Sequence, residues 1–132
     1  MDRKISCNIL TPEKIVYEGS ADYIVVPAYD GEMGFLYNHA PLISELGIGE
    51  IRLKNDEQIE FIAIQGGFVE IRNNEMTVLA EDAYKKEDID IKLTEKKLET
   101  LLNSEKSKVY EERLKMEDEI KKLRLILKLA AR

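Results

Sequence analysis

The side chains best suited to chemistry in this sequence are its single histidine, His39, and its single cysteine, Cys7. A histidine acts as a general base when a nucleophile and an orienting carboxylate lie within hydrogen-bond reach. Ser44 and Glu45 follow His39, but their spacing matches no recognisable nucleophile motif, and they read equally well as loop exterior. An enzyme with His39 as general base is therefore the weakest hypothesis, and it requires turnover that the His39→Ala variant loses.

Cys7 offers neither a disulfide nor a metal site. A single cysteine cannot form an internal disulfide, and one cysteine with one histidine falls short of a structural zinc site. Cys7 alternates with Ile5 and Ile9 in a predicted strand, where a small buried thiol is usually inert. We therefore expect no catalytic residue and no metal ligand, and we predict that Cys7 is buried.

The stretch from residue 30 to residue 42 combines turn-forming glycines with the only histidine and a proline. The Asp-Gly dipeptide at 30–31 favours a tight turn, and Gly34 permits close approach of the backbone. The His-Ala-Pro tripeptide at 39–41 disfavours helix, because a residue before proline is pushed out of the helical region. We predict a shaped loop.

Period-two alternation of apolar residues dominates residues 1–84 and predicts short β-strands. The predicted strands are Ile5–Leu10, Ile15–Tyr17, Tyr23–Val26, Ile51–Leu53, Ile59–Ile64, Phe68–Ile71 and Met76–Leu79. Turns are predicted between them at 11–13, 30–31, 47–49, 55–56, 66–67 and 73–74, with a sharp turn or bulge at the glycine pair 66–67. This spacing predicts an all-β sandwich as the N-terminal domain, residues 1–84.

Residues 85–132 contain no glycine or proline and are rich in lysine, glutamate and leucine, which predicts helices. Thr94 is expected to cap a first helix that carries Leu98, Leu101 and Leu102 on one face. A second helix is expected from about Ser107, with an apolar stripe formed by Val109, Met116, Ile120, Leu123, Leu127 and Ala130. Since apolar faces need cover, we predict an antiparallel two-helix hairpin after the sandwich.

The two predicted parts carry opposite charge. Residues 1–84 hold 6 basic and 15 acidic side chains, a net charge of −9, whereas residues 85–132 hold 14 and 11, a net charge of +3. Such asymmetry indicates that the parts meet different surroundings, or each other. The acidic sandwich disfavours nucleic-acid binding. No apolar run approaches the length of a membrane span and no signal-peptide core is present at the start, so we expect a cytoplasmic chain.

Several motifs resemble those of one family. Residues 30–42 match most of the pattern D/E-G-E-x-G-I-x-P-x-H-A-P-L, residues 66–71 are similar to S-G-G-F-L-E-V, and residues 11–13 and 77–80 stand in the expected order. On these motifs the chain resembles the epsilon subunit of F-type ATP synthases along its whole length. The resemblance implies a non-catalytic rotor subunit of the central stalk that couples ion translocation to ATP synthesis. It also implies a location at the cytoplasmic face of the bacterial plasma membrane, reached only through the complex.

The resemblance also assigns contact residues. It implies that the gamma subunit and the c-subunit ring are partners, with alpha and beta subunits of the catalytic head contacted by C-terminal helices that inhibit ATP hydrolysis. The implied contacts are Asp30, Gly31, Glu32 and Met33 for the c ring, and His39, Ala40, Pro41 and Leu42 for gamma. The inhibitory helix would use Lys121, Lys122, Arg124 and Lys128. Two plainer readings stay open: His39 bonds its own loop, or the basic residues form a solvated helix end.

Two departures from the family pattern affect these expectations. The family's ATP-binding motif I-D-x-x-R-A corresponds to residues 89–94, where Ile89 and Asp90 are retained but leucine replaces the arginine that pairs with phosphate. We expect weak or absent ATP binding and no other cofactor. Tyr37 and Asn38 replace a common proline and glycine, and asparagine tolerates the left-handed conformation that such a turn needs.

One alternative from another class of function stays open. The chain could be a β-sandwich ligand-binding or adaptor module whose helical tail dimerises as a coiled coil. That reading predicts a dimer in solution, whereas the rotor reading predicts a monomer when the chain is isolated, so sedimentation separates the two.

Overall fold

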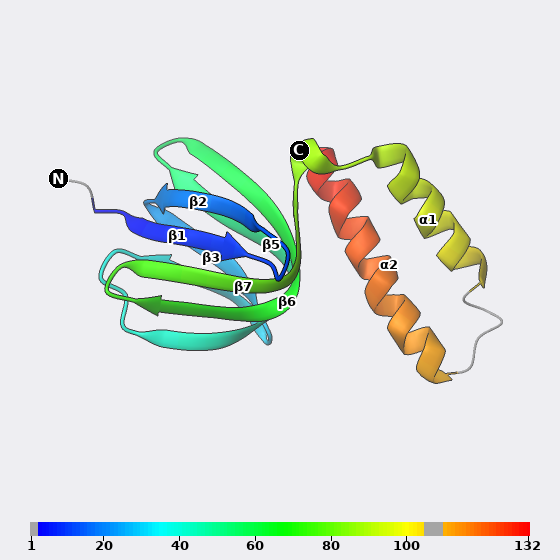
Figure 1. Ribbon diagram of the computed structural model, residues 1–132, viewed down its shortest axis with the longest axis horizontal. Coiled ribbons are helices and arrows are strands. Elements are labelled where there is room, and N and C mark those ends of the chain that lie inside the picture. Colours follow the sequence, from blue (N-terminus) through cyan, green and yellow to red (C-terminus); the bar gives the residue numbers. More distant parts are fainter. Residues whose placement is uncertain (1–2, 105–109) are drawn as a thin grey trace.

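The computed structural model describes residues 3–104 and 110–132. In this part of the chain, seven strands precede a short 3-10 helix and two α-helices. The strands are β1 (Ile5–Leu10), β2 (Ile15–Ala21), β3 (Tyr23–Ala28), β4 (Gly31–Leu36), β5 (Leu42–Asn55), β6 (Gln58–Arg72) and β7 (Glu75–Lys85). The helices are η1 (Lys86–Asp88), α1 (Ile91–Ser104) and α2 (Tyr110–Ala130). The predicted fold class, a β-sandwich followed by a helical hairpin, is confirmed (Figure 1).

One sheet with the order β2-β1-β7-β6-β5-β3-β4 folds over to make the sandwich. The long strands β5 and β6 run through both layers and bend where their mutual register skips Gly47 and Gly66. Turns were predicted at 47–49 and 66–67, and that prediction is wrong in one respect, because both segments lie inside continuous strands. Bends rather than chain reversals occur there, since both strands keep their partners on either side.

The predicted sharp turn or bulge at the glycine pair in β6 is wrong, because the register of β6 with β5 and β7 is the same on both sides of Gly66, so the strand bends without an extra residue. Gly66 and Gly67 have φ values of +60° and +112°, and the β6–β7 register skips Gly66. A Cβ atom on Gly67 would lie 1.9 Å from the carbonyl oxygen of Leu79, so only glycine fits this position. The close approach of β7 at the bend therefore depends on Gly67.

Alternate residues of the strands form the core, as the period-two pattern predicts. Cys7 is fully buried between Ile5 and Ile9, which confirms the predicted burial, and burial raises the pKa of its thiol to about 12. The other fully buried large side chains include Ile24, Phe35, Ile51, Leu53, Ile62, Ile64, Ile71 and Met76. This core fixes which faces of the strands remain available at the surface.

The prediction of a loop over residues 30–42 is wrong for its first half. Gly31–Leu36 forms strand β4, which pairs antiparallel with β3 from Ala28↔Gly31 to Tyr23↔Leu36. The glycines obscured the strand, although Met33 and Phe35 face inward with the period expected of one. A true corner follows at residues 37–41, before β5 begins at Leu42.

The start of α1 also differs from the prediction. Asp90 caps the helix, since its Oδ1 atom accepts a hydrogen bond from the backbone N–H of Leu93 at 3.1 Å. Thr94, the predicted cap, lies inside the helix, is buried, and donates its hydroxyl to the carbonyl of Asp90 at 2.8 Å. A carboxylate at the cap is favoured by the helix dipole, and the cap lies four residues earlier than predicted.

The two helices lie side by side as the predicted hairpin, and the C-terminal end of α2 lies against the sandwich (Figure 1). Ile120 and Leu123 are buried as predicted, but Ile126 and Leu129 are buried further along, where Leu127 and Ala130 were expected. Steps of three residues rotate the buried face by about 60° each. The face of α2 thus turns from α1 toward β5 and β6. Val109 and the predicted helix start at Ser107 lie outside the described residues.

A glycine-to-alanine exchange at the bend tests the role of Gly67. We expect Gly67→Ala to lower the free energy of unfolding by about 3 kcal/mol, because the new Cβ meets the Leu79 carbonyl and the φ of +112° strains any L-residue. Urea denaturation measures the change. Gly47→Ala is the matched control, since its Cβ would sit 3.6 Å from the Ala28 carbonyl, an ordinary contact. Equal losses in the two variants would contradict the assignment.

Candidate functional site

The β3–β4 turn presents the first group of predicted contact residues at one end of the sandwich. Asp30, Gly31 and Glu32 are exposed there, and the neighbouring Tyr29 is 77% exposed. Met33 is half-buried and packs against the core, so it anchors the turn and exposes little of its side chain. The Glu32 carboxylate lies 3.2 Å from a guanidinium nitrogen of Arg52 on β5. The turn therefore offers an aromatic ring and a carboxylate whose direction is set by an ion pair.

The corner after β4 presents the second group. The backbone N–H of His39 donates to the carbonyl of Leu36 at 3.0 Å, and its ring Nδ1 lies 2.7 Å from the carbonyl oxygen of Ala40. The ring also packs edge-on against Phe35, with centroids 4.8 Å apart. The local hydrogen bond weighed for His39 is thus present, and it leaves Ala40 and Pro41 exposed beside it.

No nucleophile pairs with His39 within the described residues. The Ser44 hydroxyl donates instead to the carbonyl of Glu45 at 3.3 Å. The His39 ring Nδ1 is committed to the Ala40 carbonyl. General-base catalysis therefore finds no support in the geometry of this corner.

Asn38 fixes the corner to the β6–β7 turn. Its φ of +67° is left-handed, as expected for the residue that replaces glycine. Its backbone N–H donates to Oδ1 of Asn74 at 2.6 Å, and the Asn74 amide donates back to Oδ1 of Asn38 at 3.1 Å. This reciprocal pair joins two loops that lie 36 residues apart in the sequence.

The two predicted contact groups lie at opposite ends of β4. Strand β4 has 6 residues, so at about 3.3 Å per residue the turn and the corner are separated by roughly 20 Å. One continuous partner surface of small size cannot cover both. The two groups therefore form two separate surfaces, one at each end of this strand.

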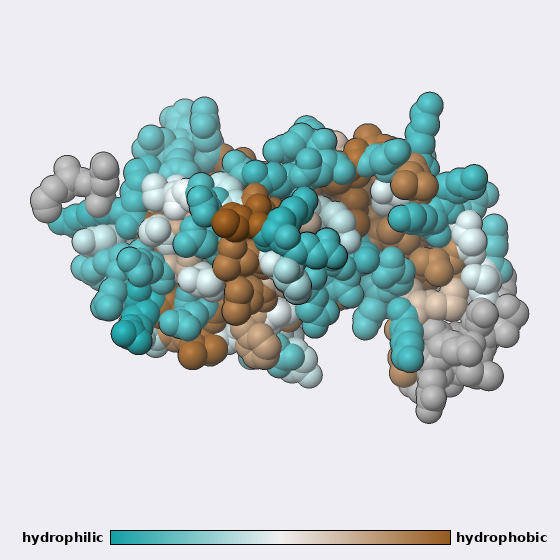
Figure 2. Space-filling model, viewed as in Figure 1, coloured by the Kyte–Doolittle hydropathy of each residue, from teal (hydrophilic) through white to brown (hydrophobic). Residues whose placement is uncertain are grey.

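A band of exposed apolar side chains crosses the outer face of the sandwich next to the corner. We call this band the apolar stripe and define it by Ile15 (58% exposed), Ile43 (69%), Phe68 (55%) and Leu79 (55%). Phe68 and Leu79 are direct cross-strand neighbours, and the half-buried Leu10 pairs with both Leu79 and Ile15. Figure 2 shows a brown band across the largely teal sandwich.

The apolar stripe joins the corner, because Ile43 follows Leu42 directly in β5. Contiguous exposed apolar surface with a polar rim is typical of a protein–protein interface. Sequence analysis did not identify these residues. The sequence does contain a signal for them. Alternation along a strand assigns every second residue to solvent, and large apolar residues such as Phe68 occupy some of these solvent-facing positions.

The predicted basic contacts of α2 divide into two pairs. Lys121 and Arg124 are exposed, whereas Lys122 and Lys128 contact the sandwich. The Lys122 ammonium lies 3.7 Å from the Asp82 carboxylate and 5.8 Å from the centre of the Tyr84 ring. Burial lowers the pKa of Lys122, but Tyr84 and Glu119 outweigh it and hold the pKa above its ordinary value.

The residues that correspond to the family's nucleotide motif form the start of α1 in this chain. Asp90 is the cap of α1, and Leu93 is exposed in the first turn with no polar group to offer a phosphate. Lys92, the nearest cation in the motif, is exposed one position earlier and so lies about 100° around the helix.

The described residues bring no group of histidine, cysteine or carboxylate side chains together that could hold a metal ion. No described helix has the length and apolar character of a membrane span.

Comparison with known proteins gives one consistent family. The model of the "ATP synthase, Delta/Epsilon chain, beta-sandwich domain" family matches residues 4–86. The ATP synthase epsilon chain of Leptospira interrogans is 40% identical over 95 residues, which cover 72% of this chain and 75% of that one. The epsilon chain of Halalkalibacterium halodurans is 43% identical over 84 residues, covering 64% and 63%.

Solved structures share the fold at low sequence identity. A chain of the Euglena gracilis mitochondrial ATP synthase superimposes with a TM-score of 0.81 at 19% identity, covering 100% of this chain and 84% of that chain. A chain from the central stalk and c ring of the Tetrahymena thermophila enzyme gives a TM-score of 0.60 at 12% identity, covering 95% of both. The agreement covers the helices as well as the sandwich.

Substitution of Asn38 tests the geometry of the corner. We expect Asn38→Ala to lower the free energy of unfolding by about 2 kcal/mol. Alanine is strained at the left-handed φ, and it lacks the side-chain oxygen that accepts a hydrogen bond from the Asn74 amide. Asn38→Gly keeps the conformation and should lose only about 1 kcal/mol. Thermal and urea unfolding measure both. If alanine costs no more than glycine, the left-handed conformation is not the constraint.

Proposed function

This chain belongs to the family of ATP synthase delta and epsilon chains, and from that premise we propose that it is a non-catalytic rotor subunit of the central stalk. It would couple ion translocation to ATP synthesis by linking the gamma subunit to the c ring. It would act at the cytoplasmic face of the bacterial plasma membrane, held there only through the complex. The observation that carries this proposal is the apolar stripe, an exposed interface on an otherwise acidic sandwich.

We propose that the apolar stripe and the adjacent corner, residues 39–42, form the contact with the gamma subunit. The stripe supplies the apolar area that stable interfaces bury at their centre. The corner adds a rigid edge, because His39 and Asn38 are both tied down by hydrogen bonds. A pre-ordered surface loses little conformational entropy on binding, which favours affinity.

The β3–β4 turn, with Asp30, Gly31, Glu32 and Met33, is proposed as the contact with the c ring. Its position at the far end of β4 supports this assignment, because a linking subunit must reach two partners on different sides. Glu32 is the exposed charge of the turn, and its pairing with Arg52 gives it a defined direction toward basic partner loops.

We further propose that the helical hairpin inhibits ATP hydrolysis through contact of Lys121, Lys122, Arg124 and Lys128 with the alpha and beta subunits. In the present arrangement Lys122 and Lys128 are engaged by acidic residues of the sandwich. Lys121, Arg124 and Lys128 are exposed, and Lys128 is at the same time paired with Glu50. Contact of all four with the catalytic head therefore requires that the hairpin first leave the sandwich.

The alternative of a dimerising coiled-coil tail finds less support. The apolar face of α2 is already covered within the chain, since Ile120, Leu123, Ile126 and Leu129 are each at most 6% exposed. A coiled-coil partner would have to displace α1 and the strands. We therefore propose a monomer for the isolated chain, which sedimentation equilibrium tests directly.

ATP binding at the hairpin is expected to be weak or absent. The expected reason is chemical, because Leu93 supplies no donor for phosphate and Asp90 is occupied as a helix cap. Isothermal titration of the purified chain with ATP and magnesium should give no saturable heat at millimolar ATP. The variant Leu93→Arg restores the missing donor and serves as a positive comparison. A sub-millimolar affinity in the unaltered chain would contradict the expectation.

An acidic side chain in the apolar stripe tests the proposed gamma contact. We expect Phe68→Asp and Leu79→Asp each to weaken binding to the purified gamma subunit by about tenfold to hundredfold, because a charge would enter the apolar centre of the interface. Surface-immobilised titration measures the dissociation constant. Leu93→Asp is the matched control, since Leu93 is 50% exposed but lies on α1. Unchanged affinity in both stripe variants would refute the contact.

A further inference from the structure

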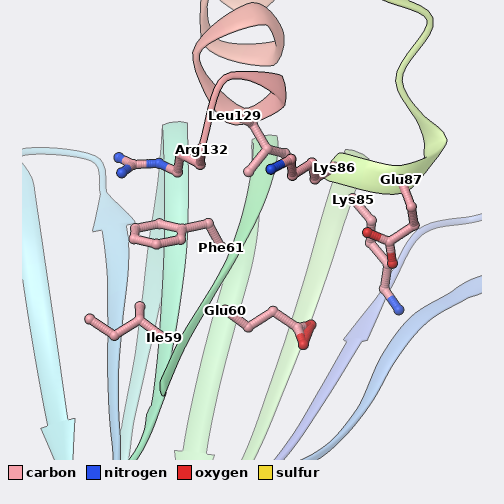
Figure 3. A pocket seen from close by; sticks show the side chains of 8 residues that line it. All are labelled: Ile59, Glu60, Phe61, Lys85, Lys86, Glu87, Leu129 and Arg132. Atoms are coloured by element: carbon pink, nitrogen blue, oxygen red, sulfur yellow. The ribbon is translucent and has the colours of Figure 1, made fainter. Parts of the chain in front are cut away.

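The arginine that follows α2 makes the most specific contact between the hairpin and the sandwich. The Nε and Nη2 atoms of Arg132 lie 2.8 and 2.9 Å from the two carboxylate oxygens of Glu50, so the ion pair is bidentate. The guanidinium also stacks over Phe61, with its central carbon 3.8 Å from the ring centre. Figure 3 shows Arg132 above the Phe61 ring, where Leu129 comes down from the end of α2.

Glu50 pairs with two cations at the C-terminal end of the chain, Lys128 in α2 and Arg132 after it. The Lys128 ammonium lies 3.5 Å from Oε1 of Glu50, and Arg132 donates to both oxygens of the same carboxylate. The Glu50 side chain is only 8% exposed, unlike the surface carboxylates Glu32 and Asp82, which are 60% and 52% exposed. Charge-assisted hydrogen bonds to a shielded carboxylate are stronger than ion pairs in open water.

The strands under this contact are covered by α2. Ala63 pairs with Glu50 across β5 and β6 and is fully buried, although its neighbours Ile62 and Ile64 face the core. Because adjacent strand residues face opposite sides, Ala63 must be covered from outside, where α2 contacts β6. The apolar cover of this patch therefore depends on α2 staying in place.

We propose that Arg132, Lys128, Glu50 and Phe61 form a clamp that holds the helical hairpin closed on the sandwich. We call this set the Arg132 clamp. Its parts come from α2 and the residues after it on one side, and from β5 and β6 on the other, so it breaks as a unit when the hairpin moves away. The Arg132 clamp thus sets the fraction of molecules in which the hairpin is free. This inference concerns the isolated chain and does not depend on the proposed partners.

The second polar contact of α2 is of a different kind. Lys122 pairs with the half-exposed Asp82 at 3.7 Å, without a bidentate geometry, and also with Glu119 of its own helix at 3.3 Å. Ten residues separate Lys122 from Arg132, about 15 Å along a helix. Loss of the Arg132 clamp therefore frees the end of α2 while Lys122 keeps a partner within the helix.

Distance measurement between two spin labels tests the clamp in the whole chain. Cysteines at Lys97 on α1 and Glu75 on β7 occupy exposed positions outside the clamp, and the native Cys7 is fully buried and does not compete for the label. The unaltered chain should give mainly one narrow distance distribution for the closed hairpin, and its mean is long because Glu75 begins β7 at the end of the strand away from the helices (Figure 1). Arg132→Gln and Glu50→Gln should each raise the ratio of open to closed molecules by about tenfold.

A double variant and a charge-matched control make the result specific. Arg132→Gln combined with Glu50→Gln should open the hairpin by less than the sum of the two single effects, because both changes remove the bidentate ion pair, while only one removes the contact with Phe61 and only the other removes the contact with Lys128. Lys115→Gln removes one positive charge from an exposed position of α2 and should leave the distribution unchanged. Unchanged distributions in both single variants, or effects that add fully, would overturn the proposal.

Acidification provides an independent readout. Burial would raise the pKa of Glu50, but its bonds with Arg132 and the charge of Lys128 hold it below the ordinary 4.5. Lys121, Arg52 and Glu32 line the same cavity of about 400 Å³. The contribution of Glu50 is therefore complete above pH 4.5 and is lost as the pH falls through the lowered pKa. The unaltered chain should open across this range more than Glu50→Gln does, and equal pH responses would refute the role of Glu50.

Discussion

The bend of β5 and β6 is the constraint on which the rest of the structure depends. At Gly47 and Gly66 the two longest strands turn from one layer of the sandwich into the other, and Gly67 lets β7 follow closely. The bend allows alternate residues of one continuous sheet to enclose a common core. It also creates the surface on which α2 rests, because Glu50 and Phe61 lie on the parts of β5 and β6 that are beyond the bend from Ile43 and Phe68. Closure of the core and docking of the helices thus share one cause.

Charge then decides how the two parts meet. The acidic sandwich and the basic helical segment form ion pairs at two places. Glu50 pairs with Arg132 and Lys128, and Asp82 pairs with Lys122. Exposed ion pairs contribute little to stability, so overall charge complementarity alone would hold the hairpin weakly. Shielding of Glu50 and stacking of the guanidinium on Phe61 make one of these points specific. A contact that depends on so few side chains opens at a lower free energy than the sheet, whose strands are joined by backbone hydrogen bonds.

The sequence predicts those features that local periodicity encodes. Alternation at Ile5, Cys7 and Ile9 identifies the inward face of β1, and the tolerance of asparagine for positive φ explains Asn38. β4 was missed because its glycines read as loop, although Met33 and Phe35 keep the period. The prediction places the helix cap at Thr94 instead of Asp90, because both threonine and aspartate commonly cap helices. The pairing of Arg132 with Glu50 joins positions 82 residues apart, and no local pattern encodes such a contact. Phe68 can be recognised as part of an exposed apolar patch only when the register of β6 and β7 is known, because that register places it beside Leu79.

The apolar stripe, proposed as a contact surface, and the seat of α2 lie on opposite sides of the bend, and this separation has a physical consequence. The apolar stripe uses β5 before Gly47 and β6 after Gly66, whereas the seat of α2 uses the other halves of the same strands. A partner bound to the stripe therefore leaves the Arg132 clamp uncovered. The hairpin can open without loss of the stripe contact, since the core that orders the stripe excludes the helices. Any coupling between the two must pass through the bend itself, because β5 and β6 are the strands common to both surfaces. A rigid docking surface and a detachable arm can thus operate independently in one small chain.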